Sequence, residues 1–188
     1  MLAGAVFGEG DVGIVLAHMR GRDKTTWYAF ARNAAQAGYR ALAFDFRGYG
    51  ESTGERDTDL DVDLIAAVEY LRSEGITSTV VMGASMGATA TVNVASRLEL
   101  AAAVSLSAPG EFLGLPAIDV ADDISEPLLL VVAENDQPYA DAAVEIDARA
   151  PITQLQMFAG NAHGTNLFAE YDTQLTMLLL DFVSARAG

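Results

Sequence analysis

Short, continuous apolar runs recur along the chain, and longer stretches with a different periodicity separate them. Continuous hydrophobicity, unlike strict alternation of apolar and polar residues, is typical of strands that are covered on both faces, as in a parallel sheet. We therefore predict a buried strand at each of the runs 12–17, 41–46, 79–82, 101–106 and 128–133, and we predict further strands at residues 2–7 and 155–158.

The stretches between the runs carry apolar residues at the spacing of a helix, with one apolar face. The clearest stripes are Trp27, Phe30, Ala31 and Ala34, then Leu60, Leu64, Ala67, Val68 and Leu71, and finally Leu167, Tyr171, Leu175, Leu178, Leu179 and Phe182. Strands that alternate with helices predict an α/β fold: a doubly wound, mostly parallel sheet flanked by helices. The one sizeable irregular connection, residues 110–123, is too short for an inserted cap domain.

Length and charge narrow the classes of function. A chain of 188 residues is most simply a single domain, spanning residues 1–188. The absence of cysteine excludes disulfides, a thiolate nucleophile and a cysteine-ligated zinc site. A net charge of −15, from 26 acidic and 11 basic residues, disfavours nucleic acid and anionic membranes as partners. No apolar run reaches the roughly 18 residues that a membrane-spanning helix needs.

The N-terminal residues lack the basic flank and apolar core of a signal peptide. A complete chain would therefore be cytoplasmic. Because a predicted strand begins already at Leu2, an upstream segment, a targeting one included, would leave the localisation open.

A possible nucleophile lies in the segment Val80–Ala90, V-V-M-G-A-S-M-G-A-T-A, where Ser85 has the spacing G-x-S-x-G. A predicted strand precedes Ser85, and residues 88–98 have a helical pattern, so the serine lies at a strand-to-helix turn with small neighbours. Such a turn presents the hydroxyl at the carboxyl edge of the sheet, where ligands bind in open α/β folds. The alternatives are a buried turn serine or a phosphate-binding loop, but the glycine patterns of the latter are absent.

A serine hydroxyl needs a base, and the base needs an acid to orient it. His163, in N-A-H-G-T-N, follows the last predicted strand, and Asp136, in A-E-N-D-Q-P, follows the strand before it. The order Ser85, Asp136, His163, each at the end of a successive strand region, predicts a catalytic triad. For Asp136 the competing role is a helix N-cap, with Glu134 and Glu111 as reserve acids, and His163 could instead be a surface histidine.

With these motifs the chain resembles an α/β-hydrolase of the small, capless kind, similar to esterases and dienelactone hydrolases. The segments that carry the resemblance are L-A-H-M-R-G at 16–21, D-F-R-G-Y-G-E-S at 45–52, the pentapeptide around Ser85, A-E-N-D at 133–136 and H-G at 163–164. The chain departs from the family where Met19 replaces a frequent glycine, which narrows the pocket entrance. We also expect part of the family's usual N-terminal sheet to be missing, which would leave an edge for another segment or a partner chain to cover.

The resemblance implies a serine esterase that acts through an acyl-enzyme, with no metal and no organic cofactor. It implies an oxyanion hole made by the backbone N–H groups of Met86 and Met19, and a small or short-acyl ester as substrate. Thioesterase, acyltransferase, amidase or peptidase activity on the same triad remains open, as does a non-catalytic binding role. The oligomeric state is open too, a homodimer included.

For other residues near these motifs we expect structural or pocket-lining roles. We expect His18 to fix the oxyanion loop rather than act as a second base, and Asp45 to hold the turn that follows it. The candidates for an acyl or alcohol pocket are Trp27, Tyr28, Phe112, Leu113, Tyr139 and Phe168, although aromatic residues at such spacings are more often part of the core.

Overall fold

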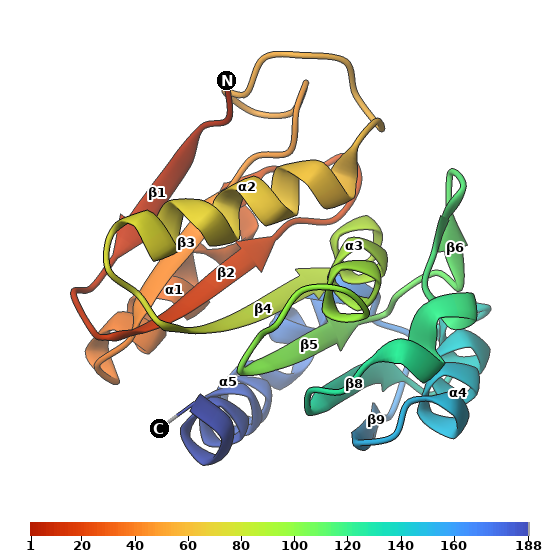
Figure 1. Cartoon of the computed structure of the whole chain (residues 1–188). Helices are drawn as coiled ribbons and strands as arrows, with labels where there is room; N and C mark the ends of the chain where they lie inside the picture. Colours follow the sequence, from red (N-terminus) through yellow and green to blue (C-terminus); the bar gives the residue numbers. More distant parts are fainter. Residues whose placement is uncertain (188) are drawn as a thin grey trace.

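A seven-stranded sheet with helices on both faces forms the centre of the protein in a computed structural model, which describes residues 1–187 (Figure 1). The strands run in the order β1-β3-β2-β4-β5-β8-β9, and all neighbours are parallel except β1, which pairs antiparallel with β3 at one edge. This arrangement confirms the predicted mostly parallel α/β fold. The strand bounds are β1 Gly4–Phe7, β2 Val12–Ala17, β3 Arg40–Phe44, β4 Ser78–Ala84, β5 Ala102–Leu106, β8 Leu128–Ala133 and β9 Thr153–Phe158.

Helices cover the two faces of the sheet. On one face lie α1 (Tyr28–Gln36) and α5 (Leu167–Ala187), and on the other lie α2 (Leu60–Ser73), α3 (Met86–Ala95) and α4 (Tyr139–Arg149). Figure 1 shows α2 and α3 in front of the sheet and α5 behind it. Among residues 1–187, no helix is long and apolar enough to cross a membrane.

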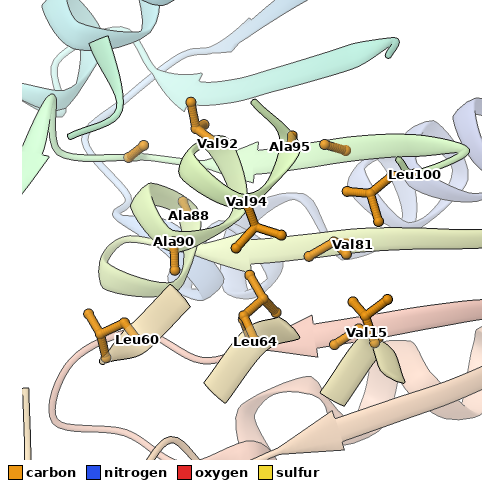
Figure 2. Close-up of a cluster of buried hydrophobic side chains, with 14 of the residues drawn as sticks. Val15, Leu60, Leu64, Val81, Ala88, Ala90, Val92, Val94, Ala95 and Leu100 are labelled. Atoms are coloured by element: carbon orange, nitrogen blue, oxygen red, sulfur yellow. The ribbon is translucent and has the colours of Figure 1, made fainter. Parts of the chain in front are cut away.

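The sheet has a hydrophobic core on each face. Alternate residues of a strand belong to one core or the other, because successive side chains point to opposite faces. Along β2, Val15 belongs to the core under α2 and α3, whereas Ile14 and Leu16 belong to the core under α1 and α5. Figure 2 shows Val15 and Val81 of the sheet facing Leu64 of α2 and Val94 of α3. Burial on both faces explains why the inner strands are continuous apolar runs, whereas no residue of the edge strands β1 and β9 is buried.

The segment 110–123 is more ordered than the sequence predicts. It contains a hairpin of β6 (Glu111–Phe112) and β7 (Leu115–Pro116), followed by the short 3₁₀ helix Ile118–Asp123. The two residues between the strands, Leu113 and Gly114, both have positive φ (50° and 84°), which is the backbone of a two-residue hairpin loop.

Two helices also differ from their predicted form. α3 covers 86–95 instead of 88–98, because its first turn starts directly after Ser85. α4 was indicated only by the possible N-cap at Asp136, because its apolar face consists mainly of alanine, with Ala140, Ala143 and Ile146 buried. Small residues give a weak periodic signal even where they pack in a core.

Candidate active site

Ser85 stands at a sharp turn between β4 and α3. Its backbone has φ 50° and ψ −116°, a conformation that is costly for any residue other than glycine and that persists only where the surroundings enforce it. The Ser85 N–H donates to the carbonyl of Leu106 at 2.8 Å, which ties the turn to β5. The residue is 8% exposed, so the hydroxyl lies at the floor of the carboxyl edge of the sheet rather than on the open surface.

The glycines on either side of Ser85 are required by close backbone approach. A Cβ on Gly83 would lie 2.1 Å from the carbonyl oxygen of Gly87. A Cβ on Gly87 would lie 2.6 Å from the carbonyl oxygen of Ala17 in β2. Neither gap admits a side chain, so the small residues of the G-x-S-x-G segment let α3 start against β4 and β2.

Asp136 and His163 meet at the ends of β8 and β9. Nδ1 of His163 lies 2.9 Å from Oδ2 and 3.1 Å from Oδ1 of Asp136. The carboxylate can only accept, so Nδ1 carries the proton and, in the neutral ring, Nε2 is left as the acceptor nitrogen. Asp136 is 6% exposed, and the ring of Tyr139 packs against the imidazole with centroids 4.2 Å apart.

Neither the alternative acids, Glu134 and Glu111, nor the alternative role of Asp136 as a helix cap fits the structure. The N-cap position of α4 is Pro138, and no side chain caps this helix, so Asp136 is not its cap. Glu134 is exposed, and Glu111 accepts from the Gly114 N–H inside the β6–β7 hairpin. Of the three acids considered from the sequence, Asp136 is the one in contact with His163.

Three loops that are distant in sequence converge beside Ser85. Gly164, directly after His163, has φ 56°, and a Cβ on it would be 3.8 Å from the Ser85 nitrogen and 3.4 Å from Sδ of Met19. The Thr165 hydroxyl donates to the same sulfur at 3.2 Å. Met19, the Ser85 turn and the two residues after His163, from the loops after β2, β4 and β9, are thus neighbours at one edge of the sheet.

The backbone of the Met19 loop is fixed by His18. Nε2 of His18 accepts from the Phe46 N–H at 3.1 Å, so Nδ1 bears the proton and donates to the Met19 carbonyl at 2.9 Å. His18 is fully buried, and its ring packs edge-on against Phe46 and Tyr49. Desolvation by burial lowers the pKa of His18 and favours this neutral form. Met86, the first residue of α3, has an N–H at a helix N-terminus, where the amide has no partner within the helix.

A buried ion pair, which the sequence patterns did not indicate, supports the same region. Nζ of Lys24 lies 2.6 Å from Oδ2 of Asp45 and 2.6 Å from Oε2 of Glu51. Burial alone would lower the pKa of Lys24, but the hydrogen bonds to Asp45 and Glu51 outweigh it and raise that pKa. Asp45 also accepts from the Glu51 N–H and the Lys24 N–H, and it therefore holds the turn that follows it, as expected.

The candidates for a substrate pocket separate into three groups. Trp27 and Phe168 pack against each other in the core between α1 and α5, and Tyr28 packs on Phe7 of β1. Tyr139 contacts His163, as described above. Phe112 and Leu113 belong to the β6–β7 hairpin, where the Arg20 guanidinium lies 5.7 Å from the Phe112 ring and Leu113 is 64% exposed.

An apolar cavity of about 420 Å³ lies between β1 and α2, among Leu2, Val6, Phe44 and Tyr70, and not beside Ser85. Within residues 1–187, no group of three or more His, Asp or Glu side chains is arranged to hold a metal ion.

Comparisons with known proteins agree with this architecture. Residues 14–178 match a family model described as the alpha/beta hydrolase family. Similar solved structures include a monoacylglycerol lipase from Paleococcus ferrophilus, with 16% identity, a TM-score of 0.84 and 99% of both chains covered. An esterase from Pyrococcus furiosus has 19% identity and a TM-score of 0.83, over 100% of this chain and 86% of that one. A proline iminopeptidase from Mycobacterium smegmatis has 14% identity and a TM-score of 0.81, over 99% and 95%. No curated protein sequence matches the chain.

Proposed function

The chain belongs to the alpha/beta hydrolase family, and from this premise we propose that it is a serine hydrolase that cleaves carboxylic esters. The observation that carries the proposal is the hydrogen bond from Nδ1 of His163 to Asp136, together with the approach of the adjacent Gly164 to Ser85. A serine on a strained turn, a histidine with its tautomer fixed and a buried carboxylate are the three components of nucleophilic acyl transfer.

In the proposed mechanism, the Ser85 hydroxyl attacks the ester carbonyl and gives its proton to Nε2 of His163. Asp136 keeps the imidazole in the correct tautomer and stabilises the imidazolium that forms. The N–H groups of Met86 and Met19 bind the oxyanion, an interaction whose loss costs about 2.7–4 kcal/mol per donor in comparable sites. His163 then protonates the leaving alcohol, and it acts again as base when water attacks the acyl-enzyme.

The substrate is proposed to be a small or short-acyl ester. The connection that could have carried a cap holds only the short β6–β7 hairpin and a 3₁₀ helix, so little surface is available to enclose a long acyl chain. A small-molecule substrate is also what membership of this family implies. The names of two similar structures, a lipase and an esterase, denote ester hydrolysis. The name of the third, a proline iminopeptidase, denotes a peptide substrate, so an amide remains the alternative substrate for this chain.

The test measures initial rates on p-nitrophenyl acetate, butyrate, octanoate and palmitate, for the wild-type protein and for Ser85→Ala. Rapid turnover of the short esters that is lost in Ser85→Ala supports the proposal. A preference for palmitate would contradict the proposed substrate size. Equal slow rates in both proteins would contradict ester hydrolysis through Ser85.

A parallel experiment separates an enzyme from a binding protein of the same fold. A fluorophosphonate probe reacts with an activated serine and not with an ordinary hydroxyl. Labelling of the wild type but not of Ser85→Ala, with no turnover of esters, would favour an amide or thioester substrate on the same residues. No labelling of either protein would favour a non-catalytic role.

A further inference from the structure

A second buried serine at the same sheet edge is not used in the mechanism above. We propose that Ser107 is a positioning residue, whose hydroxyl holds the His163 loop against the Ser85 turn. The inference rests on the proposed function, because it assigns to Ser107 a role in placing the catalytic base.

Ser107 directly follows β5, which lies between β4 and β8 in the sheet. These two neighbours lead to Ser85 and Asp136, so the end of β5 is flanked by the proposed nucleophile on one side and the proposed acid on the other. The backbone is tied to both sides. The Ser107 N–H donates to Val131 of β8 at 2.9 Å, and the preceding carbonyl, of Leu106, accepts from the Ser85 N–H at 2.8 Å.

The side chain of Ser107 is hydrogen-bonded to the loop that carries His163. Its Oγ accepts from the N–H of Gly164 at 3.1 Å, and this contact links residues 57 positions apart. Gly164 is the residue next to His163, and it is also the residue whose Cβ would approach the Ser85 nitrogen to 3.8 Å. The hydroxyl therefore anchors the loop at Gly164, the residue after the proposed base, where this loop approaches the Ser85 turn.

This hydrogen bond is in a site that excludes water. Ser107 is 1% exposed, and Gly164 is buried as well. A buried backbone N–H that loses its acceptor must find another partner or move toward water. In the absence of the hydroxyl, we expect the segment that carries His163 to shift or to sample several positions.

The backbone of Ser107 is unusual for a serine. Its φ is 55°, in the left-handed region that favours glycine. Glycine would adopt this conformation without strain but would supply no acceptor for Gly164. The position does not suit a second nucleophile, since the Ser107 oxygen accepts from a backbone N–H and the residue is less exposed than Ser85.

The difference between glycine and alanine at this position gives a sharp experiment. Ser107→Ala removes the hydroxyl and keeps a strained backbone, whereas Ser107→Gly removes the hydroxyl and relieves the strain. The matched control is Ser105→Ala, which removes a buried hydroxyl from β5 itself, two residues earlier. The kcat and KM for p-nitrophenyl butyrate and the melting temperature are measured for all three variants and the wild type.

We expect both Ser107 variants to lose about 10- to 100-fold in kcat with KM changed by less than about twofold, because the base is misplaced while the substrate pocket is intact. Ser105→Ala should keep the wild-type kcat. Ser107→Gly should melt at a higher temperature than Ser107→Ala although both are slow, which separates the role in catalysis from stability. If Ser107→Gly keeps the wild-type kcat, the proposal is overturned, because the hydroxyl is then dispensable.

A second measurement does not depend on turnover. Hydrogen exchange of the Gly164 amide, followed by NMR, should be slow in the wild type and in Ser105→Ala and fast in both Ser107 variants. Equal protection in all four proteins would overturn the inference. If the wild type hydrolyses no ester, the proposed function fails, and the exchange of Gly164 still decides whether Ser107 holds this loop.

Discussion

Nδ1 of His163 lies 2.9 Å from Oδ2 of Asp136, and the two residues follow neighbouring parallel strands, β9 and β8. Because parallel strands end at the same edge of the sheet, 27 positions of sequence separation become a direct hydrogen bond. The chain between them consists mostly of α4 and β9, and Tyr139 at the start of α4 packs its ring against His163. The pairing of β8 with β9, and not a short sequence motif, therefore places the Asp136 carboxylate beside the His163 imidazole.

Asp136→Asn should reduce kcat/KM for p-nitrophenyl butyrate by about 10³- to 10⁴-fold, because an amide that donates to Nδ1 stabilises the wrong tautomer of the base. Steady-state kinetics of the purified variants provide the measurement. Glu134→Gln is the matched control, since Glu134 is exposed and follows the same strand. An Asp136→Asn protein that is as active as Glu134→Gln would remove Asp136 from the proposed triad.

Gly87→Ala should impair both folding and activity, because its Cβ would meet backbone oxygen atoms of Ala17 and His18 at 2.6 and 2.7 Å. Backbone cannot withdraw as a flexible side chain can, so the Ser85 turn has to distort, and we expect a loss of more than about tenfold in kcat. Gly75→Ala serves as the comparison. Its Cβ would enter open space at φ 91°, and it should cost only about 1 kcal/mol of stability without changing kcat.

The sequence predicts the sheet well because burial on both faces leaves a simple signal. The runs at 12–17 and 128–133 coincide with β2 and β8. The signal weakens where packing uses small side chains, as in α4, or where two positive-φ residues make a hairpin out of an apparent loop. Positions and order in the chain sufficed to name Ser85, Asp136 and His163 as candidates.

The supporting contacts could not be predicted in the same way. Ser107 in S-L-S-A-P-G looks like any small residue after a strand, and its partner is 57 residues away. Lys24 is the sole lysine of the chain, yet nothing nearby in sequence shows that it is buried on Asp45, 21 residues later. Such contacts depend on which strand ends are neighbours, and that information exists only after the sheet has formed.

Lys24→Met should destabilise the protein by about 3–5 kcal/mol, because it leaves the fully buried carboxylate of Asp45 without its cation. Urea-induced unfolding at pH 7.5 measures the free energy of unfolding. The comparison is Arg149→Met, which removes a more exposed cation that lies 3.2 Å from Glu145, one turn earlier on α4. That change should cost less than about 1 kcal/mol. Similar losses in the two variants would mean that the Lys24–Asp45 pair contributes no more than a surface pair.

The stability of the protein should fall below about pH 6.5 in a way that depends on His18. Burial lowers the pKa of His18 from the ordinary value of 6.5, so below that pH the unfolded chain takes up a proton that the folded protein does not. The free energy of unfolding therefore decreases as the pH falls from 6.5 toward the folded-state pKa, by at most about 1.4 kcal/mol per pH unit for one proton. His18→Gln cannot titrate, and its side-chain oxygen can still accept from the Phe46 N–H. Urea unfolding of both proteins between pH 5 and 8 should give a constant difference above pH 7 and converging curves below 6.5. Curves that stay parallel over the whole range would show that His18 takes up its proton equally in both states.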